Sequence, residues 1–167
     1  IDNMKTQHYT SLLILTGLIL LSACQNNADQ EASPAMISSY DSLKAQQYGA
    51  DDYGMRKYVI AFLKRGPNRD LSPEKASELQ AAHLKNIRAM ADAGKLALAG
   101  PFFGNDDLRG LYFFNVETIE EAEALTRTDP AIQAGSLVME LKEWYGSAAL
   151  MAVDRIHQSL AKVKFAD

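Results

Sequence analysis

The chain has 167 residues, of which 47% are hydrophobic, so it is long enough for one domain with an ordinary core and does not call for a second. Its formal net charge of -4 at pH 7 and the lack of a basic run argue against a surface that binds nucleic acid regardless of sequence. The single cysteine, Cys24, excludes an internal disulfide.

Residues 1–24 have the pattern of an export signal. Lys5 supplies a positive charge, an apolar run follows over residues 12–21, and small residues precede Cys24. The run is about half of the ~20 residues that a helix needs to span a bilayer. The segment therefore indicates a signal peptide rather than a membrane-spanning helix.

The end of this signal, Leu21-Ser22-Ala23-Cys24, resembles the lipobox of bacterial lipoproteins. The resemblance implies cleavage before Cys24 and lipid on its sulfur and new amino group, and an ordinary secretory peptide is the alternative. Gln25 in the next position indicates the outer membrane, facing the periplasm. A lipidated Cys24 leaves the mature chain without a thiolate nucleophile or a cysteine-based metal site.

Residues 25–55 are interpreted as a flexible tether. Residues 25 to about 50 are rich in Asn, Gln, Ser, Ala and Asp and have no period that would bury a face. Tyr40, Tyr48 and Tyr53 are the side chains that can dock part of the tether on the domain, and the sequence leaves this open.

Between residues 56 and 146 the pattern predicts the element order β-α-β-β-α-β. Each strand is an apolar, β-branched or aromatic run bounded by turn residues, and each helix begins at a capping residue. The predicted elements are a strand over 58–63, a helix over 73–93, strands over 95–100 and 108–116, a helix over 118–127, a helical turn over 129–135 and a strand over 137–145. This order predicts an α+β, ferredoxin-like fold with both helices on one face of an antiparallel sheet.

The predicted strands are apolar on both faces. Over residues 58–63, and again over 111–114, both alternating sets of side chains are apolar. A lone domain of this order would leave one sheet face in contact with water. We therefore expect a homodimer in which two sheets pack face to face.

Residues 147–167 are predicted to form an additional amphipathic helix. Its apolar positions recur in steps of four and three, namely Ala149, Val153, Ile156, Leu160 and Val163. Packing on its own domain, packing on the dimer mate and docking of a separate partner are the three roles left open.

A histidine falls on the apolar stripe of the first predicted helix, which consists of Leu79, His83, Ile87 and Met90. Its imidazole therefore points inward, either as a hydrogen-bonded core residue or as a general acid or base. Asp129 precedes a proline and is predicted to cap the helical turn. The same carboxylate can also orient an imidazole, so the two interpretations of Asp129 are compatible.

Four further polar residues are candidates: Arg65, Asp106, Arg109 and Ser136. The arginines can hold an anionic substrate, or they can be solvated charges at strand ends. Ser136 can donate a hydrogen bond at a site, or it can be a plain turn residue. One inward histidine and one aspartate fall short of a usual ligand set, and no glycine-rich phosphate loop occurs, so neither metal nor cofactor is expected.

Three motifs resemble the YCII-related domain family in order and spacing between about Lys57 and Tyr145. They are His83 in an inward helix, residues 94–102 with the ending Ala99-Gly100-Pro101-Phe102, and residues 129–135 before the last strand. The resemblance implies a ferredoxin-like fold of the dimeric α+β barrel type and an active site made of a His–Asp pair. That pair maps onto His83 and Asp129.

The resemblance also implies, where the family is given an activity, a lyase or elimination reaction on small ring compounds. The lipid anchor and the C-terminal helix depart from the family's usual pattern, so no cytoplasmic member's substrate is carried over to this chain.

Two functions follow as hypotheses. In the first, the chain is a small-molecule lyase or proton-transfer enzyme. Asp129 then orients His83 as general base or acid, and Ser136 donates a hydrogen bond at the site. The substrate then lies in a cleft lined by Arg65, Arg109 and the turn containing Pro101 and Phe102. In the second, the chain is a non-catalytic periplasmic module, held at the membrane through Cys24, that binds a small ligand or assists a partner.

Overall fold

The computed structural model describes residues 39–163 of the chain. The predicted signal, Cys24 and the first part of the tether lie outside the described residues. No helix of the described part is long and apolar enough to cross a membrane. The elements in order are α1 (Ser42–Tyr48), β1 (Met55–Arg65), α2 (Pro73–Asp92), β2 (Leu96–Pro101), β3 (Leu108–Phe114), α3 (Ile119–Thr126), α4 (Pro130–Gln133), β4 (Leu137–Ser147), the 3₁₀ helix η1 (Ala148–Ala152) and α5 (Val153–Leu160).

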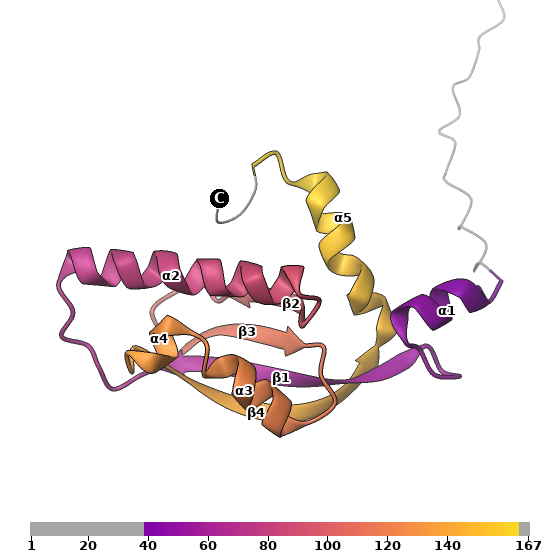
Figure 1. The fold of residues 1–167 in the computed structure, drawn as a ribbon, viewed down its shortest axis with the longest axis horizontal. Helices are drawn as coiled ribbons and strands as arrows, with labels where there is room; N and C mark the ends of the chain where they lie inside the picture. Colours follow the sequence, from indigo (N-terminus) through magenta and orange to yellow (C-terminus); the bar gives the residue numbers. More distant parts are fainter. Residues whose placement is uncertain (1–38, 164–167) are drawn as a thin grey trace, which may run out of the picture. The chain divides into compact units, whose positions relative to one another are not determined.

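The four strands form one antiparallel sheet in the order β2-β3-β1-β4. Strand β1 is central, pairing with β4 along its whole length and with β3 from Val59 to Lys64. Helix α2 connects β1 to β2, and α3 with α4 connects β3 to β4 (Figure 1). The predicted ferredoxin-like α+β fold is confirmed.

Helix α2 is positioned by local signals at both ends. The side chain of Ser72 accepts a hydrogen bond from the Lys75 N–H, and Pro73 occupies the first helical position. The helix ends at Asp92, and Gly94 two residues later has a φ of 68°, the left-handed conformation that glycine adopts without strain. Along its 20 residues only His83 and Met90 are buried.

The core lies between the sheet and the two connecting helices. Strand β1 buries alternate residues there, and Tyr112 and Phe114 of β3 pack beside them. The buried cluster also takes one residue from each helix: its members are Val59, Ala61, Leu63, Met90, Leu96, Tyr112, Phe114, Val116 and Ala122. Both helices therefore cover the same face of the sheet, as predicted.

The opposite face of the sheet is not covered by helices α2 and α3. Ile60 and Phe62 of β1 point to this face and are only partly buried, and Trp144 packs edge-on against Phe113 while staying 38% exposed. We call this surface the open face. It has the apolar character on which the homodimer prediction depends, and the dimer stays a prediction.

Helix α1 lies within the segment that the composition assigns to the tether. The Asp41 side chain accepts a hydrogen bond from the Lys44 N–H, and Gly49 ends the helix in the left-handed conformation. Arg56 of β1 donates to the Tyr48 carbonyl at 2.8 Å, which joins the helix to the sheet. The helix has no buried residue, so a search for a buried period does not find it; its signal is the cap at each end.

The C-terminal helix differs from the single long helix that is predicted. The Ser147 side chain caps the 3₁₀ helix η1, and α5 follows only from Val153 to Leu160. Helix α5 packs near η1 and β2, yet none of its residues is buried, and Ile156 is 50% exposed. Its apolar stripe is thus left largely uncovered by the described part of the chain.

Candidate active site

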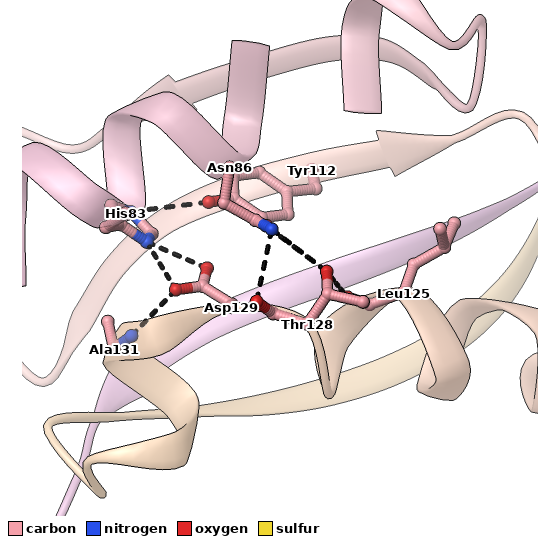
Figure 2. Close-up of polar contacts among 7 residues, drawn as sticks. All are labelled: His83, Asn86, Tyr112, Leu125, Thr128, Asp129 and Ala131. Atoms are coloured by element: carbon pink, nitrogen blue, oxygen red, sulfur yellow. Dashed lines mark hydrogen bonds and ion pairs between the residues drawn. The ribbon is translucent and has the colours of Figure 1, made fainter. Parts of the chain in front are cut away.

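The structure brings His83 of α2 and Asp129 at the start of α4 into direct contact (Figure 2). The His83 Nδ1 atom lies 2.8 Å from Asp129 Oδ2 and 3.0 Å from Oδ1. Both side chains are buried: His83 is 7% exposed and Asp129 is fully enclosed. Residues that are 46 positions apart in the sequence therefore form one buried pair, as a His–Asp site requires.

Asp129 has a second task, because it also caps helix α4. Its Oδ1 accepts a hydrogen bond from the Ala131 N–H at 2.8 Å, and its backbone carbonyl accepts from Ile132 and Gln133. A carboxylate offers only acceptors, so the His83 nitrogen facing it must carry a proton. In the neutral form of the imidazole, Nε2 is then the nitrogen that can accept a proton.

The basic nitrogen of His83 faces Tyr112 of β3. The Tyr112 hydroxyl lies 3.3 Å from Nε2, and the two rings are stacked with centroids 6.3 Å apart. Burial raises the pKa of the Tyr112 phenol well above its ordinary value, and the nearby Asp129 charge raises it further. The phenol therefore stays protonated and can donate its hydrogen bond to Nε2.

Tyr112 is a residue of this site that was not predicted from the sequence, and Arg69 in the cavity described below is another. Because Tyr112 lies in a strand of apolar residues, the sequence pattern assigns it to the core like its neighbours. The available signal was its chemistry: a tyrosine on the covered side of a strand needs a partner for its hydroxyl, and an inward histidine supplies one.

A second contact holds the chain before Asp129 against α2. Asn86, one turn beyond His83, donates through Nδ2 to the carbonyl and the hydroxyl of Thr128 (Figure 2). The Thr128 hydroxyl in turn donates to the Leu125 carbonyl at the end of α3. These bonds fix the distance between the two helical segments that carry the pair.

A cavity of about 240 Å³ lies beside the His–Asp pair. Ala131, whose N–H binds Asp129, is part of its wall, and so is Leu79, one helical turn before His83. The pair itself does not line the cavity. The lining residues are Arg65, Asn68, Arg69, Leu71, Ala76, Leu79, Gln80, Arg109, Ala131, Ser136 and Leu137.

Arg65 and Arg109, both predicted as substrate-binding residues, meet in this cavity. Arg65 Nη2 donates to the carbonyl and to the side-chain oxygen of Asn105, each at 2.7 Å. Arg109 Nη1 donates to the carbonyls of Gly104 and Asp106. The loop after β2 is therefore held by both guanidinium groups, and Asp106 takes part through its backbone.

Ser136 also lines the cavity, at a close crossing of two backbones. Its carbonyl accepts hydrogen bonds from the Gly66 N–H and from Arg69 Nη1. A Cβ atom on Gly66 would lie 2.2 Å from the Gly135 carbonyl oxygen, so only glycine permits this approach. The Ser136 hydroxyl makes no hydrogen bond to residues 39–163 and is available to a ligand.

Pro101 and Phe102 do not line the cavity. Phe102 donates its N–H to the Arg109 carbonyl and leaves its own side chain 43% exposed. The predicted cleft between helix, sheet and this turn is thus not enclosed by the described chain. No group of three or more His, Cys, Asp or Glu side chains within residues 39–163 is placed to hold a metal ion.

The model of the YCII-related domain family matches residues 57–145. One solved structure with a similar fold is the 5-chloro-2-hydroxyhydroquinone dehydrochlorinase of Burkholderia phenoliruptrix, in complex with 2,5-dihydroxybenzoquinone. The two sequences are 20% identical, and the match covers 52% of this chain and 92% of that chain with a TM-score of 0.39. No curated protein matches the chain.

Proposed function

Since the chain belongs to the YCII-related domain family, we propose that it is a small-molecule enzyme of proton-transfer or elimination type. One observation carries the proposal: a buried imidazole is bonded through one nitrogen to a carboxylate and through the other to a phenol, beside a polar cavity. A lyase reaction on a small ring compound is also what the family resemblance implies.

In this proposal His83 is the general base. The substrate's acidic hydrogen replaces the Tyr112 hydroxyl as the partner of Nε2, which takes the proton. Asp129 holds the Nδ1–H and stabilises the imidazolium that forms. The imidazolium then returns the proton to the leaving group, and a base of this kind contributes about 10²–10⁴-fold in rate.

A non-catalytic ligand-binding module is the second candidate. The observation in its favour is that the His83 side chain is almost fully buried and that neither His83 nor Asp129 lines the cavity. In this case the pair only ties α2 to α4, and ligands bind without being converted.

The two candidates are separated by turnover. The full-length chain and its His83→Gln variant are incubated with a set of small ring compounds that carry an acidic C–H bond, and products are measured by mass spectrometry. The enzyme proposal expects a product from the native chain and none from His83→Gln, at equal circular dichroism. Turnover by the variant at the native rate would contradict it.

A ring-nitrogen experiment tests the geometry independently of any substrate. The ¹⁵N shifts of the His83 ring at neutral pH are expected to show a proton on Nδ1 in the native chain. Asp129→Asn is expected to shift this tautomer, because an amide in that place offers both a donor and an acceptor. A tautomer that does not respond to Asp129→Asn would show that the pair is not formed in solution.

We also propose a homodimer that packs through the open face. The support is the partly exposed apolar set on that face, which includes Leu98, Val138 and Trp144. Light scattering on the full-length chain checks this assembly, and a monomer at micromolar concentration would contradict it.

Membrane attachment through lipid on Cys24, at the outer membrane and facing the periplasm, is proposed from the lipobox resemblance. Cys24→Ser is expected to move the protein from the membrane fraction to the supernatant of fractionated cells. An unchanged distribution would contradict a lipid anchor.

A further inference from the structure

We propose that the cavity beside the His–Asp pair binds a small organic acid, with its carboxylate on Arg65, Arg69 and Arg109 and its apolar body against α2. This proposal rests on the proposed function and deepens it by naming the substrate class.

The charge of the cavity is the first argument. Three guanidinium groups line it, and no Asp or Glu side chain does. Within residues 39–163 none of the three arginines forms an ion pair, whereas other cations of the chain do so, as Lys57 does with Glu143. The lining of the cavity therefore carries positive charge that no side chain of the described residues neutralises by an ion pair, and such a lining attracts an anion.

The second argument is that the arginines are held in place by backbone rather than by carboxylates. Arg65 and Arg109 donate through one terminal nitrogen to the loop after β2, and Arg69 donates through Nη1 to the Ser136 carbonyl. A guanidinium has five N–H donors in a planar fork, so each arginine keeps further donors for a ligand. Groups that are already fixed lose little side-chain entropy when an anion binds.

The third argument comes from the rest of the wall. Leu71 in the loop before α2, Ala76 and Leu79 in the first two turns of α2, and Leu137 of β4 form an apolar side. Ser136 adds a hydroxyl that makes no hydrogen bond within residues 39–163. Inorganic phosphate would leave the apolar side unfilled. The size of about 240 Å³ and the mixed lining suit a ring-sized body that carries a carboxylate.

The position of the cavity relative to the pair completes the assignment. Ala131 belongs to the cavity wall and binds Asp129, and Leu79 lies one turn before His83 on the same helix. The wall of the cavity is therefore one turn of α2 away from His83 and one hydrogen bond away from Asp129. The anchor lies at the strand ends and the base lies on the helix, so binding and proton transfer use different residues.

The test is isothermal titration calorimetry of the full-length chain with benzoate, with its neutral counterpart benzamide and with inorganic phosphate. Benzoate is expected to bind at least about tenfold more tightly than either of the other probes. Arg109→Gln is expected to weaken benzoate by about 10–100-fold, which is the usual worth of a hydrogen bond to a charged group. Arg69→Gln, at an exposed position, gives the same test with less risk to folding.

Arg127→Gln is the matched control, because it removes an equal charge from an exposed ion pair with Glu123, outside the cavity. Equal binding of benzoate and benzamide, or equal affinities in the Arg69, Arg109 and Arg127 variants, would overturn the proposal. Phosphate binding as tight as benzoate would overturn the assignment to an organic acid.

His83→Gln separates this proposal from the enzyme proposal. It is expected to keep the benzoate affinity of the native chain and to lose turnover. Suppose that benzoate binding depends on the arginines and that turnover survives in His83→Gln. This result would contradict the acid/base mechanism and support the anion site. If benzoate binding does not depend on the arginines and turnover is lost in His83→Gln, only the anion site is contradicted.

Discussion

The two faces of the sheet are built from the same strands but have opposite surroundings. On the covered face Val59, Ala61 and Leu63 of β1 are buried by the chain's own helices, whereas Ile60 and Phe62 on the open face stay partly exposed. The covered face also holds a buried titratable pair, which is tolerable only because each polar atom of the pair has a fixed partner. The difference is that the chain's own helices bury one face together with its polar pair, whereas the apolar residues of the other face stay partly exposed.

The largest effect is expected on the covered face. Asp129→Ala leaves the His83 Nδ1–H and the Ala131 N–H without their buried acceptor, so it should reduce the free energy of unfolding by about 3–5 kcal/mol. Urea unfolding measures this loss. Asp92→Ala is the control, since its exposed pair with Arg88 should be worth less than about 1 kcal/mol. Equal losses in the two variants would mean that the covered face does not depend on its pair.

The next effect tests the open face. Trp144→Glu places a charge in the apolar surface that a second copy would cover, and it should weaken the dimer by about 30-fold or more while the monomer stays folded. Sedimentation at several protein concentrations measures the shift. Leu43→Glu on α1, at a residue that is 77% exposed, should leave the assembly unchanged. If both variants behave like the native chain, the open face is not the interface.

A smaller effect concerns the third member of the site. Tyr112→Phe removes the hydroxyl from His83 Nε2 and should lower the free energy of unfolding by about 1 kcal/mol at neutral pH. The pKa of Tyr112 is raised in the folded chain, mainly by burial, so its contribution is present below an unfolded pKa of about 10 and is lost as the pH rises above that value.

Tyr112→Phe should therefore also flatten the alkaline decline of stability, measured by urea unfolding from neutral pH to above about pH 10. Tyr53→Phe, at a residue that is 87% exposed, should leave the decline as it is in the native chain. An alkaline decline of the same slope in all three proteins would contradict the role assigned to the buried phenol.

The smallest effect belongs to a charged strip on the open face. Hydrogen bonds from Lys142 and Lys64 lower the pKa of Glu140 to about 2. Its contribution to stability is therefore present above the ordinary carboxyl pKa and is lost as the pH falls through about 2. Glu140→Gln should flatten the acid decline slightly, and added salt should mask the difference because these groups are exposed. If stability falls at acid pH to the same extent in Glu140→Gln as in the native chain, the fall is caused by other carboxylates.

The fold could be predicted because its signals are local. Ser72, Thr118 and Asp129 each cap the helix that follows, and the strand runs are bounded by turn residues. The pairing of His83 with Asp129 followed from an inward helix position and from the family resemblance together. Helix α1 was missed because its caps enclose residues with no buried face.

The rest of the site could not be predicted because it depends on contacts between distant segments. Arg69 lines the cavity at the point where the backbones of Gly66 and Ser136 cross closely, and no local sequence pattern predicts that crossing. Tyr112 looks like any apolar strand residue until its hydroxyl meets His83. Phe102 is the opposite case: it was expected to line the cleft because it belongs to a recognisable motif, but it does not line the cavity.

The double task of Asp129 bears on how proteins of this fold can be sorted by sequence. Its carboxylate caps helix α4 as well as bonding to the imidazole, so it is expected to stabilise the fold in a copy without the proposed reaction too. An aspartate at this position therefore marks a well-formed domain and does not distinguish active from inactive copies. Under the proposed function the diagnostic positions are those of His83 and Tyr112, because a relative with apolar residues at both would keep the scaffold without the proposed base.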